Sequence, residues 1–248
     1  MQSLSKFTNS PIIIGGCGRS GTTLLAAILS SHPSIYSYTY ETMAFCPSAW
    51  MDPLNRNVPF SLSILEEVLI DSPPSKENNR FLEKTPRNTL VYKRIADYFN
   101  DQVKIINLVR DGRDVVLSKY PGKEDTQYVT ADFWKTEIEY GIECEDFPWF
   151  KTFRYEDLIL NFKETLLDIC EFCEIEYCDQ LTNYTDFTKY KESDAWSHRK
   201  IQSPHQKSIG KWKNHMDHIE VKKLNSDPHN IDLLKKYNYE IISDCSSI

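Results

Sequence analysis

One segment near the N-terminus, PIIIGGCGRSGTTLL from residue 11 to 25, constrains the fold most. The isoleucines at 12–14 predict a buried strand, and the residues from Leu24 onward predict an amphipathic helix. The glycines between them allow positive φ and close backbone approach, so N–H groups at the helix N-terminus can face an anion. The segment therefore predicts a phosphate-binding loop; a glycine-rich turn without a ligand is the alternative.

The loop nearly fits the triphosphate-binding pattern G-x-x-x-x-G-K-[ST]. Gly16 and Gly21 occupy the glycine positions and Thr23 the hydroxyl position, but Thr22 stands where the pattern has lysine. A cation occurs earlier, at Arg19. Because that lysine contacts the β- and γ-phosphates of ATP or GTP, its absence favours a nucleotide with a different distal group.

Size and charge narrow the class of protein. The 248 residues are long enough for one large α/β domain or two small ones, and the 40% apolar and 26% charged content is ordinary for a soluble globular protein. A net charge of −7 argues against a nucleic-acid partner. There is no apolar run near the roughly 20 residues that span a bilayer, and no secretory signal, so we expect a cytoplasmic protein without a membrane span. A chain whose membrane anchor had been removed would look the same.

The seven cysteines do not predict a disulfide framework or a metal site. Their number is odd and their spacing irregular. The single C-x-x-C pair, Cys170 and Cys173, falls at helical spacing with Leu166 and Ile169, which favours a buried helix face. We expect no metal.

A carboxylate follows the predicted second strand. Pro33 ends the first helix near Ser31, and residues 35–40 alternate as a short strand does. Glu41 comes directly after it, so this side chain is placed to face the loop. The alternative is an ordinary solvated glutamate.

A lysine follows the predicted third strand. Residues 46–80 carry five prolines and one predicted helix at 61–70, which is typical of an irregular excursion beside a substrate. Phe81 and Leu82 then predict a brief strand, with Pro86 in the first turn of the next helix. Lys84 thus lies at the carboxyl end of a strand, where ligands of open α/β sheets bind, although it could equally be a surface charge.

A second anion site is predicted after the apolar strand at 103–109. Arg110 ends this strand, and Ser118 lies eight residues later, expected two turns into a helix. A guanidinium fork and a hydroxyl donor suit a phosphate far from the first loop. A solvated turn is the competing interpretation.

The rest of the chain continues the alternation of helices and strands. We predict a helix at 130–144, a strand at 149–155, one helix at 156–173 and a last helix at 231–237. This order predicts a single three-layer α/β/α domain with a mostly parallel sheet, preceded by a tail at residues 1–10. Residues 190–215 are basic around Trp212, which favours a solvated face or a flap over an anionic ligand.

Three separated segments resemble one family, the sulfotransferases that use 3′-phosphoadenosine 5′-phosphosulfate. GRSGTTLL resembles the family's 5′-phosphosulfate loop, LVRDGRDVVLSKY its 3′-phosphate motif, and SIGKWKNH its cofactor-covering segment. The resemblance spans residues 11–213 in islands, and it is the first two motifs together, about 90 residues apart, that make it specific.

The resemblance implies a role for each matching position. It places the 5′-phosphosulfate on Gly18, Arg19, Ser20, Gly21, Thr22 and Thr23, and the 3′-phosphate on Arg110 and Ser118. It also implies that Tyr155 lies near the adenine, that Arg199 and Lys200 contact the 3′-phosphate, and that Ile209, Gly210, Lys211 and Trp212 cover the cofactor.

One departure from the family bears on catalysis. The cytosolic small-molecule branch has Lys-Thr-His where this chain has Lys84, Thr85 and Pro86, and that histidine is its base. The carbohydrate and protein-tyrosine branches instead resemble this chain in carrying a glutamate after the second strand. The resemblance therefore implies Glu41 as general base, with Lys84 and Arg19 stabilising charge in the transition state.

The expected activity is transfer of a sulfuryl group to a hydroxyl acceptor, with adenosine 3′,5′-diphosphate as the other product. The acceptor could be a carbohydrate, a tyrosyl side chain or a small molecule, and residues 42–80 and 121–150 are expected to line its site. A nucleotide-dependent phosphotransferase and a non-catalytic nucleotide-binding protein are the alternatives. The sequence does not indicate an oligomeric state.

Overall fold

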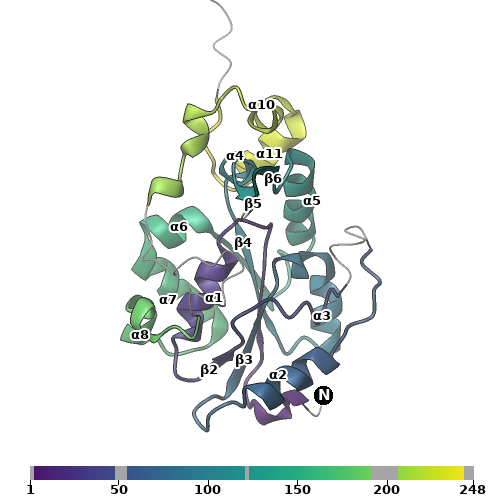
Figure 1. Cartoon of the computed structure of the whole chain (residues 1–248), viewed down its shortest axis with the longest axis vertical. Coiled ribbons are helices and arrows are strands. Elements are labelled where there is room, and N and C mark those ends of the chain that lie inside the picture. Colours follow the sequence, from purple (N-terminus) through teal and green to yellow (C-terminus); the bar gives the residue numbers. More distant parts are fainter. Residues whose placement is uncertain (1–2, 48–54, 121–122, 191–205, 243–248) are drawn as a thin grey trace, which may run out of the picture.

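A five-stranded parallel sheet forms the centre of the computed structural model, which describes residues 3–47, 55–120, 123–190 and 206–242. Its order is β2-β3-β1-β4-β7, and every pairing is parallel (Figure 1). The strands are β1 (Ile12–Gly15), β2 (Ile35–Ser37), β3 (Arg80–Lys84), β4 (Lys104–Val109) and β7 (Phe150–Arg154). The predicted mostly parallel sheet is confirmed.

Helices cover both faces of this sheet because successive strand residues point to opposite sides. Ile12 and Ile14 are buried in one cluster with Leu25, whereas Ile13 and Ile105 are buried in another with Ile95. The first face carries α1 (Thr22–Ser30), α6 (Tyr155–Leu160), α7 (Phe162–Cys173), α8 (Asp179–Thr182) and α9 (Tyr184–Phe187) (Figure 1). The second carries α2 (Ser63–Asp71), the 3-10 segment η2 (Pro86–Val91), α3 (Tyr92–Tyr98) and α5 (Ala131–Ile142).

A third apolar cluster, built around the fully buried Trp134, lies beyond the carboxyl end of β4. It joins α4 (Gly112–Val116) to the C-terminal helices α10 (Ile219–Ser226) and α11 (Pro228–Lys236). The same end holds the hairpin of β5 (Lys119–Tyr120) and β6 (Lys123–Gln127) and the 3-10 segments η3 (Gln206–Ser208) and η4 (Lys211–Asn214) (Figure 1). This layer brings the C-terminal part of the chain over the strand ends.

Several boundaries differ from the prediction. The helix expected at 156–173 is two helices, because Asn161 between them has non-helical angles of φ −121° and ψ 48°. The helix after Arg110 ends at Val116, so the prediction that placed Ser118 two turns into it is wrong. Strand β2 ends at Ser37 rather than at residue 40. At the N-terminus, Ser3–Lys6 forms a 3-10 turn, η1, and Leu4 packs on the second-face cluster.

Among the described residues, no helix has the length and apolar character that crossing a bilayer requires.

Candidate functional site

The loop predicted to bind phosphate, called the phosphate-binding loop below, connects β1 to α1, and its backbone requires glycine at two positions. Gly16 has φ +144° and Gly21 has φ +95°. A Cβ on Gly16 would lie 2.3 Å from the carbonyl oxygen of Leu108 in β4, so a side chain there has no room. The first N–H groups of α1 have no acceptor within the helix, which leaves them available to an anion.

The polar residues of the loop point to a ligand as well. Arg19 adopts a left-handed conformation, φ +73°, which is uncommon outside glycine. Ser20 is fully buried, and within the described ranges its hydroxyl has no hydrogen-bond partner. Since an unsatisfied buried hydroxyl costs about 1–3 kcal/mol, this group fits a site whose missing partner is a ligand oxygen.

The predicted catalytic carboxylate and lysine are in direct contact. Lys84, at the end of β3, places its Nζ 2.8 Å from Oε1 of Glu41, which follows β2. The lysine side chain is 3% exposed and the glutamate side chain 19%. Lys84 also donates to Oγ1 of Thr23 in the first turn of α1, at 3.3 Å. The fold therefore brings together three predicted site residues, from the segment after β2, the end of β3 and the first turn of α1.

A second group gathers around Arg110 at the end of β4. Its Nη1 donates to the carbonyl of Arg19 at 2.9 Å, and its Nη2 donates to the carbonyl of Ser208 at 2.5 Å. The guanidinium lies 4.5 Å from the ring centroid of Tyr155. Arg110 thus connects the phosphate-binding loop, the start of α6 and η3.

Ser208 was not among the predicted site residues. Its Oγ lies 2.8 Å from the Tyr155 hydroxyl, in addition to the contact with Arg110. The available signal was its position directly before Ile209 in the segment SIGKWKNH, but the partner residues are 53 and 98 positions away, so spacing could not reveal them.

The C-terminal flap, defined here as residues 206–215, is attached to α4. Asp114 accepts hydrogen bonds from the backbone N–H groups of Gly210, at 2.6 Å, and Trp212, at 3.0 Å. Burial raises the pKa of Asp114 above its ordinary value, while these two donors act in the opposite direction. Trp212 is buried, Ile209 is half-buried and Lys211 is exposed. Of the four predicted covering residues, two are therefore anchored through Asp114.

Of the other three residues predicted to hold the 3′-phosphate, the structure describes only Ser118. Ser118 follows α4 and donates its N–H to the carbonyl of Val115, and within the described chain no hydrogen bond joins it to Arg110. Arg199 and Lys200 lie outside the described residues. Cys170 and Cys173 are buried as free thiols on α7. In the part of the chain that the structure describes, no three His, Cys, Asp or Glu side chains form a metal-binding group.

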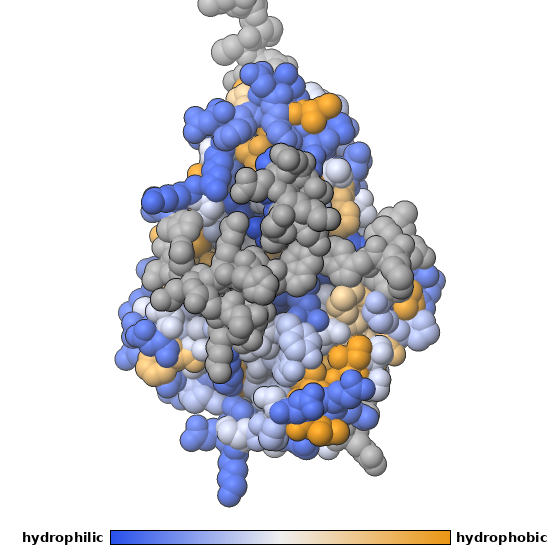
Figure 2. Space-filling model, in the orientation of Figure 1, coloured by the Kyte–Doolittle hydropathy of each residue, from blue (hydrophilic) through white to orange (hydrophobic). Residues whose placement is uncertain are grey.

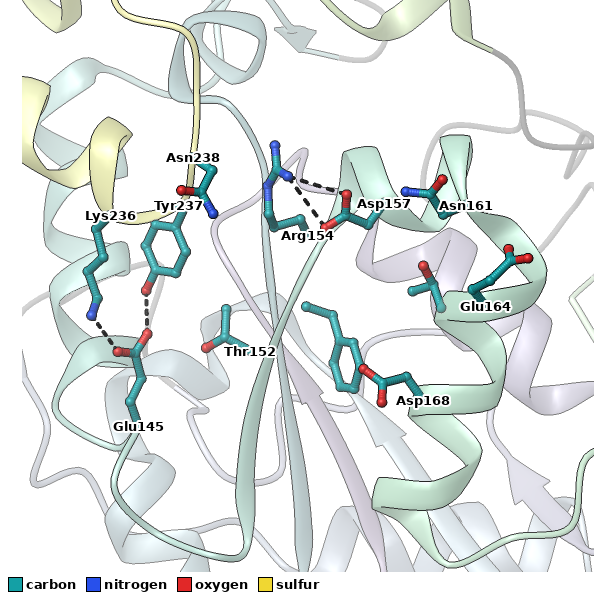
Figure 3. Close-up of a pocket in the computed structure, with 12 residues that line it drawn as sticks. Glu145, Thr152, Arg154, Asp157, Asn161, Glu164, Asp168, Lys236, Tyr237 and Asn238 are labelled. Atoms are coloured by element: carbon teal, nitrogen blue, oxygen red, sulfur yellow. Dashed lines mark hydrogen bonds and ion pairs between the residues drawn. The ribbon is translucent and has the colours of Figure 1, made fainter.

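A cavity of about 670 Å³ lies at the other edge of the sheet, along β7 between α7 and the end of α11 (Figure 3). Within it, Arg154 pairs with Asp157 and Lys236 with Glu145, which also accepts a hydrogen bond from the Tyr237 hydroxyl. None of the predicted catalytic or cofactor-binding residues lines it. Figure 2 shows a largely hydrophilic surface over the C-terminal layer and an apolar area near α2.

Comparison with known proteins identifies the family. The sulfotransferase domain model matches residues 9–229. A "Putative protein-tyrosine sulfotransferase" of Caenorhabditis briggsae is 29% identical over 70% of this chain and 68% of that protein. An uncharacterized protein of Aquifex aeolicus is 23% identical over 84% of this chain, which spans about a third of that relative (31%).

Two solved structures share the fold over nearly the whole chain. The sulfotransferase domain of the Synechococcus PCC 7002 olefin synthase has a TM-score of 0.61 at 20% identity, covering 96% of this chain and 97% of that one. Mouse sulfotransferase SULT7A1, solved in complex with PAP, has a TM-score of 0.55 at 16% identity, covering 95% and 91%. The predicted membership is confirmed, and this chain belongs to the sulfotransferase domain family.

Proposed function

We propose that this chain transfers a sulfuryl group from 3′-phosphoadenosine 5′-phosphosulfate to a hydroxyl acceptor. The observation that carries the proposal is the Glu41–Lys84 contact beside a phosphate-binding loop in which Thr22 replaces lysine. A carboxylate can act as general base on an attacking hydroxyl, and a cation beside it can stabilise negative charge that develops on the transferring sulfuryl group. The sulfotransferase domain match supports this reaction class.

The residues around the loop fit the donor nucleotide. The loop N–H groups, the hydroxyl of Ser20 and the side chain of Arg19 would hold its phosphosulfate. Arg110, with Tyr155, would hold its 3′-phosphate and adenine, in the role that the resemblance assigns them. When bound, the donor supplies an electrophilic sulfuryl group whose leaving group is adenosine 3′,5′-diphosphate.

The chain's own groups then act on the acceptor and on developing charge. An Oε atom of Glu41 takes the proton of the acceptor hydroxyl while the acceptor oxygen forms the new S–O bond. Lys84 and Arg19 stabilise the negative charge on the transferring group and on the oxygen whose bond to sulfur breaks. Thr23 accepts a hydrogen bond from Lys84 and so helps to fix the ammonium group.

A tyrosyl hydroxyl is the first acceptor to test. The Caenorhabditis briggsae relative carries the name "Putative protein-tyrosine sulfotransferase". The resemblance also matches Glu41 to the glutamate that the carbohydrate and protein-tyrosine branches carry after the second strand. Sugars and small phenols are the other hydroxyl classes that the same chemistry would accept.

The test is an acceptor screen with labelled phosphosulfate donor. Tyrosine-containing peptides, oligosaccharides and simple phenols are each incubated with the full chain, and products are read as a mass gain of one sulfate group. Sulfation of any acceptor that disappears in Glu41→Gln supports the proposal.

A second experiment compares the thermal unfolding of the protein in the presence of adenosine 3′,5′-diphosphate with its unfolding in the presence of ATP plus Mg²⁺. Stabilisation by ATP alone would instead support a phosphotransferase, and diphosphate binding without transfer to any acceptor would support a non-catalytic protein.

A further inference from the structure

Strand β3 presents two neighbouring charged residues to opposite sides. Lys84 reaches the site, whereas Glu83 points to the other face and is 2% exposed. The Glu83 carboxylate accepts three side-chain hydrogen bonds: Thr42 Oγ1 at 2.8 Å, Thr85 Oγ1 at 2.6 Å and Asn88 Nδ2 at 2.7 Å. A buried carboxylate with three hydrogen bonds therefore lies next to Lys84 in the chain, on the opposite face of β3.

The hydrogen bonds of Glu83 fix the segment that carries Glu41. Thr42 is the next residue after Glu41, so its hydrogen bond to Glu83 restrains the backbone from which the Glu41 side chain projects. Met43 has φ +54°, a conformation that costs a side-chain-bearing residue about 1–3 kcal/mol. The turn is held by Thr85 Oγ1, which accepts from Met43 N at 3.2 Å, and by Thr42 Oγ1, which accepts from Ala44 N at 3.3 Å.

The same group of side chains reaches the phosphate-binding loop. Asn88 Nδ2 also donates to the carbonyl of Ile14 in β1, at 3.2 Å. Two residues earlier, the carbonyl of Pro86 accepts from Gly16 N at 3.1 Å. Glu83 and Asn88 thus connect the Glu41 segment to the strand and loop on which the donor would be bound.

Stability alone does not account for a carboxylate in this position. Burial raises the pKa of Glu83 above its ordinary value, against the three hydrogen bonds, so its ionised form is costly there. An apolar side chain of similar volume often stabilises a core as well or better. A buried acid that bonds both Thr42 and Thr85 is better explained by what it positions.

We propose that Glu83 is a positioning residue, which acts through Thr42 to hold the Glu41 carboxylate beside Lys84 and at a fixed offset from the phosphate-binding loop. This inference rests on the proposed function, because it assigns Glu83 to the catalytic geometry of Glu41. It predicts that the hydroxyl of Thr42, which touches neither donor nor acceptor in this scheme, is needed for turnover.

Thr42 gives a matched pair of variants. Thr42→Val keeps the shape but removes the hydroxyl, and Thr42→Ser keeps the hydroxyl. Turnover of the full chain is followed as release of adenosine 3′,5′-diphosphate, with a tyrosine-containing peptide and with water as acceptors. We expect Thr42→Val to lower kcat roughly 10- to 100-fold with the KM for the donor unchanged, and Thr42→Ser to retain kcat, because small displacements of a catalytic group cost this much.

A double-mutant cycle with Glu41→Gln separates the two proposals. If Thr42 acts through Glu41, adding Thr42→Val to Glu41→Gln lowers kcat no further. Full turnover in Glu41→Gln would overturn the assigned base. A large loss in Glu41→Gln combined with wild-type kcat in Thr42→Val would overturn only the positioning role.

Hydrogen exchange gives a measurement that does not depend on an acceptor. With adenosine 3′,5′-diphosphate bound, we expect faster exchange of the Met43 and Ala44 amides in Thr42→Val and Glu83→Gln than in wild type or Thr42→Ser. Unchanged exchange at these amides in both variants would contradict the proposed tie, whatever the acceptor is.

Discussion

The guanidinium carbon of Arg113 lies 3.7 Å from the ring centroid of Trp212. Arg113 is held in turn by Asp111, and the next residue, Asp114, accepts the N–H groups of Gly210 and Trp212. The RDGRD segment that follows β4 therefore does more than supply Arg110. It also anchors the flap over the strand ends through stacking and two hydrogen bonds to a carboxylate.

Removing the Asp114 carboxylate should loosen the flap. Hydrogen bonds to a charged group are worth about 1.5–3 kcal/mol, so we expect Asp114→Ala to weaken binding of adenosine 3′,5′-diphosphate by on the order of tenfold or more. Isothermal titration calorimetry measures this directly. The exposed Asp232→Ala on α11 serves as the control and should bind as wild type does. Equal affinity in Asp114→Ala would mean that the flap does not contribute to nucleotide binding.

Lys84 should matter for turnover rather than for holding the product nucleotide. Lys84→Met keeps most of the side-chain length and removes the charge that faces Glu41. Loss of one such electrostatic group typically costs about 10²-fold or more in kcat. Steady-state kinetics should therefore show a large fall in kcat, whereas titration with adenosine 3′,5′-diphosphate should show little change in Kd. Near-wild-type kcat would rule out its assigned role.

The glycines of the loop should differ sharply in their tolerance of a methyl group. A Cβ at Gly16 would meet a backbone carbonyl at 2.3 Å and would force φ +144° on a non-glycine residue. A Cβ at Gly18 would meet a side chain, the Tyr128 ring, at 2.7 Å, and Gly18 does not have a positive φ. We expect urea unfolding to show a loss of at least about 1–3 kcal/mol for Gly16→Ala and a smaller loss for Gly18→Ala. Equal losses would contradict the backbone argument.

A buried acid beneath the loop should give the protein a pH-dependent stability. Burial raises the pKa of Glu137 from 4.5 to about 7, although Arg87 and Thr89 hydrogen-bond to it. Between these values the folded chain retains a proton that the unfolded chain releases. The contribution of Glu137 to the free energy of unfolding should therefore fall as pH rises from about 4.5 to 7.

Urea unfolding across this pH range, with Glu137→Gln as the comparison, measures the effect. As pH rises, the free energy of unfolding of wild type should fall relative to that of Glu137→Gln. Asp132→Asn, at an exposed position of the same helix, controls for the loss of a carboxylate. A difference that grows with pH would show that the Arg87 contact, not burial, dominates.

Local pattern was enough to predict the sheet and the residues at its strand ends. Apolar runs placed β1, β3 and β4, and parallel strands necessarily bring their carboxyl ends to one edge. The contact between Glu41 and Lys84 follows from that rule, although its 2.8 Å geometry required the fold. The sequence could therefore nominate a pair without showing that the two groups touch.

Features that depend on distant partners were missed. Ser208 joins the Arg110 site through residues 53 and 98 positions away. The sequence did not single out Glu83, because its hydrogen bond to Thr42 joins residues 41 positions apart, although Thr85 and Asn88 are near it in the chain. The end of α4 at Val116, and with it the misplacement of Ser118, was not signalled by any proline or glycine in VVLSKY.

The hydrogen bond from Lys84 to Thr23 has a consequence for how such a loop could change its substrate. The ammonium group that triphosphate-binding loops carry within the loop is here contributed by a neighbouring strand, and it reaches the first turn of α1 from the side. Installing the missing lysine by Thr22→Lys would add a second cation next to the residue that Lys84 already contacts. On the proposed roles, a change between the two chemistries would therefore involve the end of β3 as well as the loop.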